Sequence, residues 1–281
     1  MRLILNKILF ICCLCLILTG CSTFKDLFSR DSKAADDAEY AEWTAEKFRT
    51  EAKKEVEKSN YEKAIKHSQA LETRYPFGAD SAQTELDIAY AYFKNNEPES
   101  AIAAADRFIK INPRNSAIDY AYYLKGLVNY NRGISFVDRF LPTDTSQRET
   151  GGASDAIKNF EDLIQRFPNS KYIADSRLRM IALKNNLAMH EVHIARYYIK
   201  RHEYVAAANR ATTVIEKYPR TPAVPYALLA LNEAYTNLNQ NGLASDTKRV
   251  YDLNFPNGPV ILEQATSTFS HKVWDFIGLD K

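Results

Sequence analysis

The chain has 281 residues, of which 46% are hydrophobic and 26% are charged, with 37 Lys and Arg against 35 Asp and Glu. A chain of this length and composition can bury a hydrophobic core of its own. The near balance of charge argues against a general nucleic-acid binder, since such proteins carry a marked basic excess.

The first 20 residues predict a secretory signal peptide. Arg2 and Lys7 form a short positive segment, and an uncharged apolar run follows over residues 8–18. The run is too short to span a bilayer as a helix but has the length of a signal-peptide core. It ends in Leu-Thr-Gly-Cys at residues 18–21, which resembles the bacterial lipoprotein box. The alternatives are an ordinary secretory signal and a chance cysteine.

The lipoprotein box implies that residues 1–20 are cleaved and that Cys21 carries covalent diacylglyceryl and N-acyl lipid. In Gram-negative lipoproteins, Asp directly after the acylated cysteine favours retention at the inner membrane. By resemblance to them, Ser22 at this position predicts sorting to the outer membrane, on its periplasmic face. Three acyl chains exceed the two signals that stable anchoring needs. We expect no other cofactor. Residues 22–38 are mostly polar and predict a flexible tether that begins after the lipidated cysteine.

Cleavage also changes the cysteine and charge counts. Cys12, Cys13 and Cys15 leave with the signal, so the mature chain keeps one cysteine, which is acylated. This excludes a disulfide and a cysteine-based metal site in the mature protein. Loss of Arg2 and Lys7 lowers the number of basic residues from 37 by two, so that it equals the number of acidic residues, 35.

The rest of the chain repeats one unit. Five segments end in a similar sequence at a proline, and an alanine stands twelve residues before each: Ala64 and Pro76, Ala101 and Pro113, Ala156 and Pro168, Ala207 and Pro219, Ala244 and Pro256. Apolar residues three and four apart predict a helix in each segment, and proline cannot continue it. A second amphipathic segment follows each turn, as in residues 81–94 and 118–130. No run alternates as a strand does, so we predict an all-α chain.

The unit resembles the tetratricopeptide repeat, a helix pair with an A-x3-F pattern and a later proline, as in Ala156 and Phe160. The resemblance implies a solenoid of five such pairs over residues 39–258, each packed on the next. A polar addition, 141–152, lies in the third repeat, with Gly151-Gly152 expected in a loop. A long first helix, 171–201, opens the fourth repeat. A C-terminal tail, 259–281, follows and is expected to be helical.

One stretch, "MHEVHIAR", has the spacing of a metal site. His190 and His193 could share a helix face, but a zincin needs H-E-x-x-H, and Ile194 stands at its second histidine. We found no third ligand, no nucleotide-binding glycine loop and no G-x-S-x-G sequence. We therefore interpret the pair as surface or groove histidines and predict a protein that is not an enzyme. An enzyme that uses the pair is the weakest alternative. The 17 tyrosines fill repeat interfaces, or in part line a concave face that holds extended peptides.

Several stretches together resemble the BamD family, lipoproteins of the outer-membrane β-barrel assembly machine. They are "RYPFG" (74–78), "IAYAYFK" (88–94), "DRFIKINP" (106–113), "DYAYYLKGL" (119–127), "FPNSKYIAD" (167–175), "IARYYIKR" (194–201) and "NRATTVIEKYP" (209–219). The resemblance spans about residues 40 to 255. It implies a non-catalytic scaffold that binds the periplasmic domains of the barrel-forming subunit, BamA, and helps recognise unfolded outer-membrane proteins for insertion. It also implies other small assembly lipoproteins as partners.

Two site residues follow from this resemblance. Tyr75 in "RYPFG" matches a family tyrosine linked to recognition of the substrate signal, where it would offer a rigid amphipathic contact. Arg210 matches a family arginine linked both to BamA coupling and to the substrate signal, where it would offer a charge-assisted fork to a carboxylate. Tyr75 could instead be only a packing residue at its turn. Arg210 stands among Ala and Val and needs a partner.

The sequence leaves alternatives for two segments and for the function. "DTSQR" (144–148) resembles a loop of the family, or is a tolerated polar insertion. Residues 260–281 extend beyond the resemblance, and their apolar Val273, Trp274, Phe276 and Ile277 either cap the last repeat or dock on a partner or the membrane surface. A tetratricopeptide lipoprotein that serves as an adaptor for peptidoglycan enzymes would share the box and the repeats, but has no reason to carry "RYPFG".

Overall fold

The computed structural model describes residues 39–76, 81–132 and 151–259. The predictions for the signal peptide, the lipid on Cys21, the tether, "DTSQR" and the tail beyond residue 259 lie outside the described residues. No helix in the described ranges is long and apolar enough to cross a membrane.

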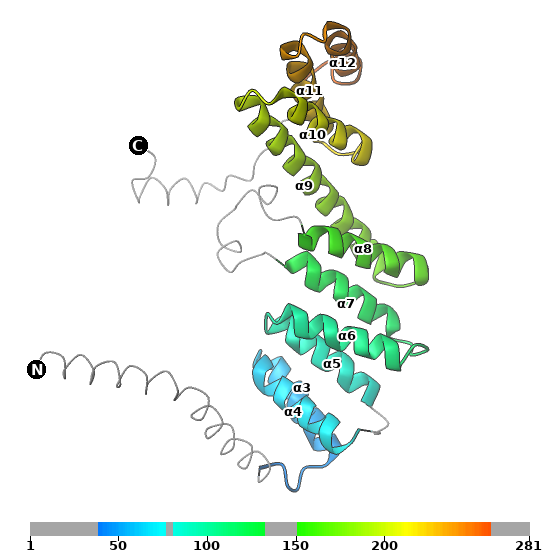
Figure 1. The fold of residues 1–281 in the computed structure, drawn as a ribbon. Helices are drawn as coiled ribbons and strands as arrows, with labels where there is room; N and C mark the ends of the chain where they lie inside the picture. Colours follow the sequence, from blue (N-terminus) through cyan, green and yellow to red (C-terminus); the bar gives the residue numbers. More distant parts are fainter. Residues whose placement is uncertain (1–38, 77–80, 133–150, 260–281) are drawn as a thin grey trace, which may run out of the picture. The chain divides into compact units, whose positions relative to one another are not determined.

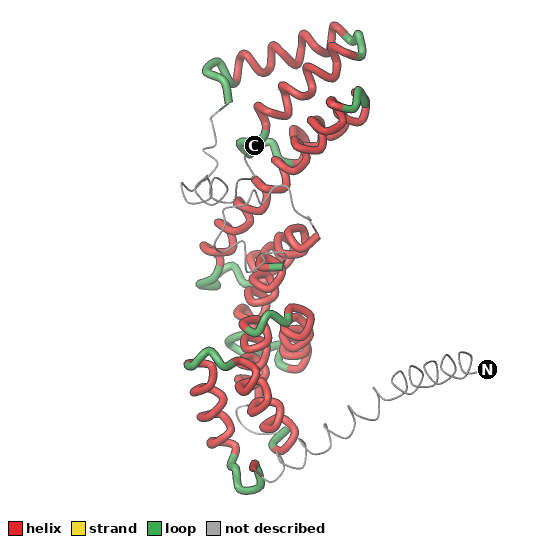
Figure 2. The backbone as a smooth tube through the Cα atoms, turned by 90° about the vertical axis from the view of Figure 1, so that its left-hand side faces the viewer, coloured by secondary structure: helices red, strands yellow, loops and turns green. Residues whose placement is uncertain are grey.

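All regular secondary structure in the described ranges is α-helical, which confirms the predicted fold class (Figure 2). The helices, with the labels of Figure 1, are α3 (Ala45–Glu57), α4 (Tyr61–Arg74), α5 (Ser81–Lys94), α6 (Pro98–Ile111), α7 (Ile118–Asn131), α8 (Gly151–Arg166), α9 (Ile173–Lys200), α10 (Tyr204–Lys217), α11 (Val224–Asn237) and α12 (Asn241–Asn254).

The helices pack as five successive pairs: α3 with α4, α5 with α6, α7 with α8, α9 with α10, and α11 with α12. This confirms the tetratricopeptide-like arrangement. The chain divides into two compact units, one that ends at Gly78 and holds α3 and α4, and one that begins at Ala79 and holds the other helices. Within the second unit each pair also packs on the next, through α6 on α7, α8 on α9 and α10 on α11 (Figure 1).

The repeated alanines lie in buried helix contacts and the repeated prolines lie just after helix ends, as the sequence predicts. The second helix of each pair contains the alanine, and the five alanines are at most 8% exposed. Each of these helices ends two residues before its proline. The intervening residue leaves the helical region, as at Tyr75, with φ −131° and ψ 56°. The small alanine side chains thus allow close packing of helices. The first four prolines lie in turns between successive pairs, and Pro256 follows the last described pair.

The turn inside four of the pairs uses one left-handed residue: Ser59, Asn96, His202 and Asn239 have φ between 59° and 62°. At Ser59 the amide donates to the carbonyl of Val56 at 2.9 Å, and the next amide, of Asn60, donates to that of Glu55 at 2.8 Å. This is the Schellman arrangement, which satisfies the last carbonyls of a helix. None of the four residues is glycine, so each of these turns carries a backbone cost.

Of the predictions for the two additions to the repeat, the structure confirms one and corrects the other. The long first helix of the fourth pair is confirmed as α9, whose 28 residues span about 42 Å. The expected loop pair Gly151-Gly152 is wrong, since α8 begins at Gly151. A Cβ at Gly152 would lie 3.1 Å from the carbonyl oxygen of Asn129 on α7. Glycine is therefore used there for a close helix contact, which local sequence does not reveal.

A polar network fixes the first half of α9 against α7. Tyr123 donates its hydroxyl to Asp175 Oδ2 at 2.6 Å, and Arg179 Nε donates to the same oxygen. The Arg179 guanidinium also lies 4.8 Å from the ring centre of Tyr130. Burial and the bond to Asp175 raise the pKa of Tyr123 to about 12. The first half of α9 is thereby held against the third pair, while α9 also packs with α10 in the fourth pair.

Candidate functional site

Tyr75 lies directly after α4, at the turn before Pro76. Its hydroxyl donates to the backbone carbonyl of Trp43 at 3.0 Å, and its ring meets Phe48 edge-on at a centroid distance of 6.5 Å. The residue is nevertheless 39% exposed. Tyr75 therefore packs against the first pair with one edge of its ring, while part of its side chain stays exposed.

Tyr75 borders an aromatic cluster, which we define as Tyr40, Trp43, Phe48 and His67. Tyr40 and Phe48 are buried, and their rings lie 5.1 Å apart. The Tyr40 hydroxyl and His67 Nδ1 form a hydrogen bond of 2.9 Å. Burial lowers the pKa of His67, although the negative charges of nearby glutamates act to raise it. The cluster gives Tyr75 a rigid base, since its members lock one another in place.

Arg210 projects from α10 and is paired within the chain. Its Nη1 lies 3.1 Å and 3.4 Å from the two carboxylate oxygens of Glu191 on α9. The side chain of Arg210 is 44% exposed and that of Glu191 is 19% exposed. The partner that the sequence argument required for Arg210 is thus present in the chain itself. Because Glu191 engages only Nη1, the fork of Nε and Nη2 is not directed at this carboxylate.

Tyr75 and Arg210 belong to different compact units.

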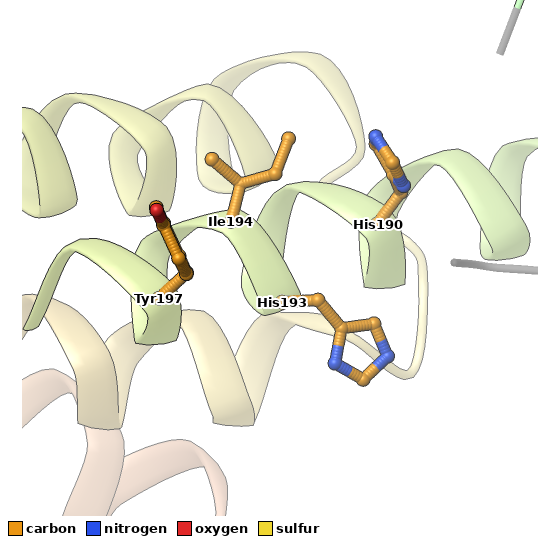
Figure 3. A pocket seen from close by; sticks show the side chains of 4 residues that line it. All are labelled: His190, His193, Ile194 and Tyr197. Atoms are coloured by element: carbon orange, nitrogen blue, oxygen red, sulfur yellow. The ribbon is translucent and has the colours of Figure 1, made fainter. Parts of the chain in front are cut away.

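The histidine pair lines an open hollow of about 350 Å³ on α9, together with Ile194 and Tyr197. Figure 3 shows the rings of His190 and His193 pointing in different directions from their helix. Among the residues that the structure describes, no group of three or more His, Cys, Asp or Glu could hold a metal ion. The arrangement suits a shallow contact surface better than a metal centre.

Several exposed apolar residues escape sequence reasoning. Tyr197 is 54% exposed, and Arg201 Nη1 donates to its hydroxyl at 2.9 Å. Leu178 and Ile181, on the first half of α9, are 68% and 57% exposed. Helical periodicity marks such residues as core candidates, because a sequence does not tell which face of a long helix stays uncovered. One sequence signal could have identified them: α9 has more apolar residues than one narrow buried stripe of a helix can hold.

Comparison with known proteins agrees with these observations. Residues 41–250 match a family model described as YfiO, an outer membrane lipoprotein. The "Outer membrane protein assembly factor BamD" of Neisseria meningitidis serogroup B is 41% identical over 92% of this chain and 94% of its own length. The proteins of the same name from Xylella fastidiosa and Vibrio cholerae are 34% and 35% identical over 87% and 73% of this chain, and 80% and 85% of their own lengths.

Both findings cover most of the chain. An outer membrane lipoprotein and assembly factor, without a catalytic role, is what the resemblance predicted. The chain belongs to the YfiO family of outer membrane lipoproteins, which it shares with the assembly factors named BamD.

Proposed function

We propose that this protein is a scaffold of the outer-membrane β-barrel assembly complex, which binds the periplasmic domains of a BamA-like barrel subunit and helps recognise unfolded outer-membrane proteins. The observation that supports this most is the similarity to named assembly factors over 92% of the chain. The repeat architecture fits, because helix pairs of this kind present extended surfaces to other proteins. The other small assembly lipoproteins are proposed to dock on the same helices.

Arg210 is proposed as a contact to the barrel subunit. Its side chain is 44% exposed, and Glu191 engages its guanidinium through one nitrogen only. A carboxylate of the partner would approach the remaining N–H groups and form a two-pronged, charge-assisted contact. Glu191 holds the side chain in place before binding, which lowers the entropy lost on association.

The test is a native pull-down with the full lipidated chain from mild detergent. We expect a large β-barrel protein in stoichiometric amount, and less of it with Arg210→Glu. Arg132→Glu is the matched control, since Arg132 is 37% exposed and also forms a 3.1 Å ion pair, with Glu99. Peptidoglycan enzymes without a barrel protein would refute the scaffold and favour the adaptor. Retention of the barrel protein by Arg210→Glu would keep the function and remove this residue from the contact.

Tyr75 is proposed to contact the final strand of an unfolded barrel protein. The exposed part of its ring would lie against an apolar side chain of that strand, while the Trp43 carbonyl orients the hydroxyl. This can be tested by the binding of a labelled final-strand peptide to the purified chain, followed by fluorescence anisotropy. We expect Tyr75→Ala to weaken binding and Tyr75→Phe, which keeps the ring, to retain most of it.

Tyr197→Ala is the control for Tyr75, because Tyr197 is a comparably exposed tyrosine on α9. If Tyr75→Ala lowers the stability of the first pair but leaves peptide affinity unchanged, Tyr75 is a packing residue only.

A further inference from the structure

Helix α12 is the last helix that the structure describes, and its surface differs from that of the equivalent helices. In α6, α8 and α10, the positions one, four and eight residues after the repeat alanine are apolar, and most of them pack in cores shared with the following pair: Ile102, Ala105 and Ile109; Ile157, Phe160 and Ile164; Ala208, Ala211 and Ile215. In α12 the same positions hold Ser245, Lys248 and Asp252, and Lys248 Nζ pairs with Asp252 at 2.7 Å. This face is polar, as the outer face of a capping repeat is.

A different face of α12 is apolar and exposed. We call Leu243, Val250 and Leu253 the α12 stripe, and they are 48%, 44% and 76% exposed. The equivalent positions in the other second helices of this unit are mostly polar: Ser100, Arg107 and Lys110 in α6; Asp155, Asp162 and Gln165 in α8; Ala206, Thr213 and Glu216 in α10. The stripe is therefore a departure specific to α12 rather than a feature of the repeat.

We propose that residues 269–277 of the same chain dock as a short helix on the α12 stripe. Phe269, Val273, Phe276 and Ile277 have the spacing of one helix face, i, i+4, i+7 and i+8. A helix of this length is marginal in water by itself and gains stability from an apolar surface. The tail thus pairs with α12 through a face that is mostly polar in the other second helices of this unit.

Length and position favour this occupant. The stripe runs about 15 Å along α12, and a helix over residues 269–277 covers about 12 Å. The tail follows the Leu253 end of the stripe in the chain, after residues 254–259, and residues 260–268 can span up to about 30 Å. The segment can therefore turn back and lie along α12. Asp246 lies on the same face, but Arg249 Nη2 pairs with it at 3.0 Å and offsets its charge.

The two tryptophans of the chain, Trp43 and Trp274, provide the test. In a Trp43→Phe background, Trp274 is the only tryptophan and reports on the tail. The full chain is purified in mild detergent, its helical circular dichroism is checked, and acrylamide quenching of Trp274 is measured with and without Leu253→Glu. We expect Trp274 to be shielded in the background protein, and the equilibrium constant for docking to fall at least about tenfold in the variant, because a buried leucine is lost.

Leu178→Glu is the matched control, since Leu178 is 68% exposed on α9 and outside the stripe, and it should leave quenching unchanged. Val250→Glu should repeat the effect of Leu253→Glu. Free quenching of Trp274 in the background protein would overturn the proposal. So would shielding that the stripe variants do not change, or shielding that disappears on dilution, which would mean a second copy as the partner. None of these outcomes depends on the barrel subunit.

Discussion

Gly126 of α7 lies directly against the ring of Phe160 of α8. A Cβ at this glycine would stand 2.3 Å from Phe160 Cε1, which is far inside van der Waals contact. Phe160 is fully buried and belongs to the A-x3-F sequence that identified the repeat. The contact therefore leaves no room for a side chain at residue 126 while Phe160 keeps its position.

The first prediction concerns this contact. Gly126→Ala should destabilise the protein by about 1–3 kcal/mol, because Phe160 has to leave its position or the helices have to separate. Urea unfolding followed by circular dichroism measures the change. Gly242→Ala in α12 is the control, since nothing lies within 4 Å of a Cβ there, and it should be neutral or stabilising. Equal effects at both glycines would contradict the close packing.

The second prediction concerns the left-handed turns. Ser59 has φ 61° and is exposed, so Ser59→Gly should raise stability by about 0.5–1 kcal/mol as the strain is removed. Ser245→Gly, in the interior of α12, should instead lower it by about 0.5 kcal/mol, because no strain is relieved there. Thermal unfolding of the two variants beside the parent decides the sign.

The third prediction concerns His67. Burial lowers its folded-state pKa below the ordinary value of 6.5, so the unfolded chain binds the proton more readily. The stabilisation by neutral His67 is present above about pH 6.5 and is lost as the pH falls toward the folded pKa, by up to about 1.4 kcal/mol per pH unit. Trp43, whose ring lies 5.2 Å from that of His67, reports unfolding of the first pair in a Trp274→Phe background. His67→Gln should flatten this pH dependence, and an unchanged profile would contradict it.

The fourth prediction concerns Asp175. Although burial opposes it, the hydrogen bonds from Arg179 and Tyr123 lower the pKa of its carboxyl. Asp175→Asn should cost about 1–3 kcal/mol and speed amide exchange in the first half of α9, since Arg179 loses its charged partner there. Asp252→Asn removes a surface pair and should change stability by less than about 1 kcal/mol. Exchange that rises equally along the whole of α9 would contradict a local anchoring role.

The sequence by itself determined the repeat, the all-α class and the family. These rest on local rules that five copies reinforce, since alanine is needed where helices touch and proline where they end. Ser22 after the lipoprotein box predicted the outer membrane, and "RYPFG" with the other stretches predicted the assembly machinery. Family membership confirms the location and the assembly role.

Only the tertiary structure decided which faces of these helices are covered. It showed that Gly151 and Gly152 begin a helix, that Glu191 is the partner of Arg210, and that Tyr75 leans on Trp43 and Phe48. It also separated the polar end of α12 from its apolar stripe. Periodicity indicates which residues of a helix share a face. Whether that face is buried depends on contacts between segments far apart in the chain, which are fixed only when the pairs pack.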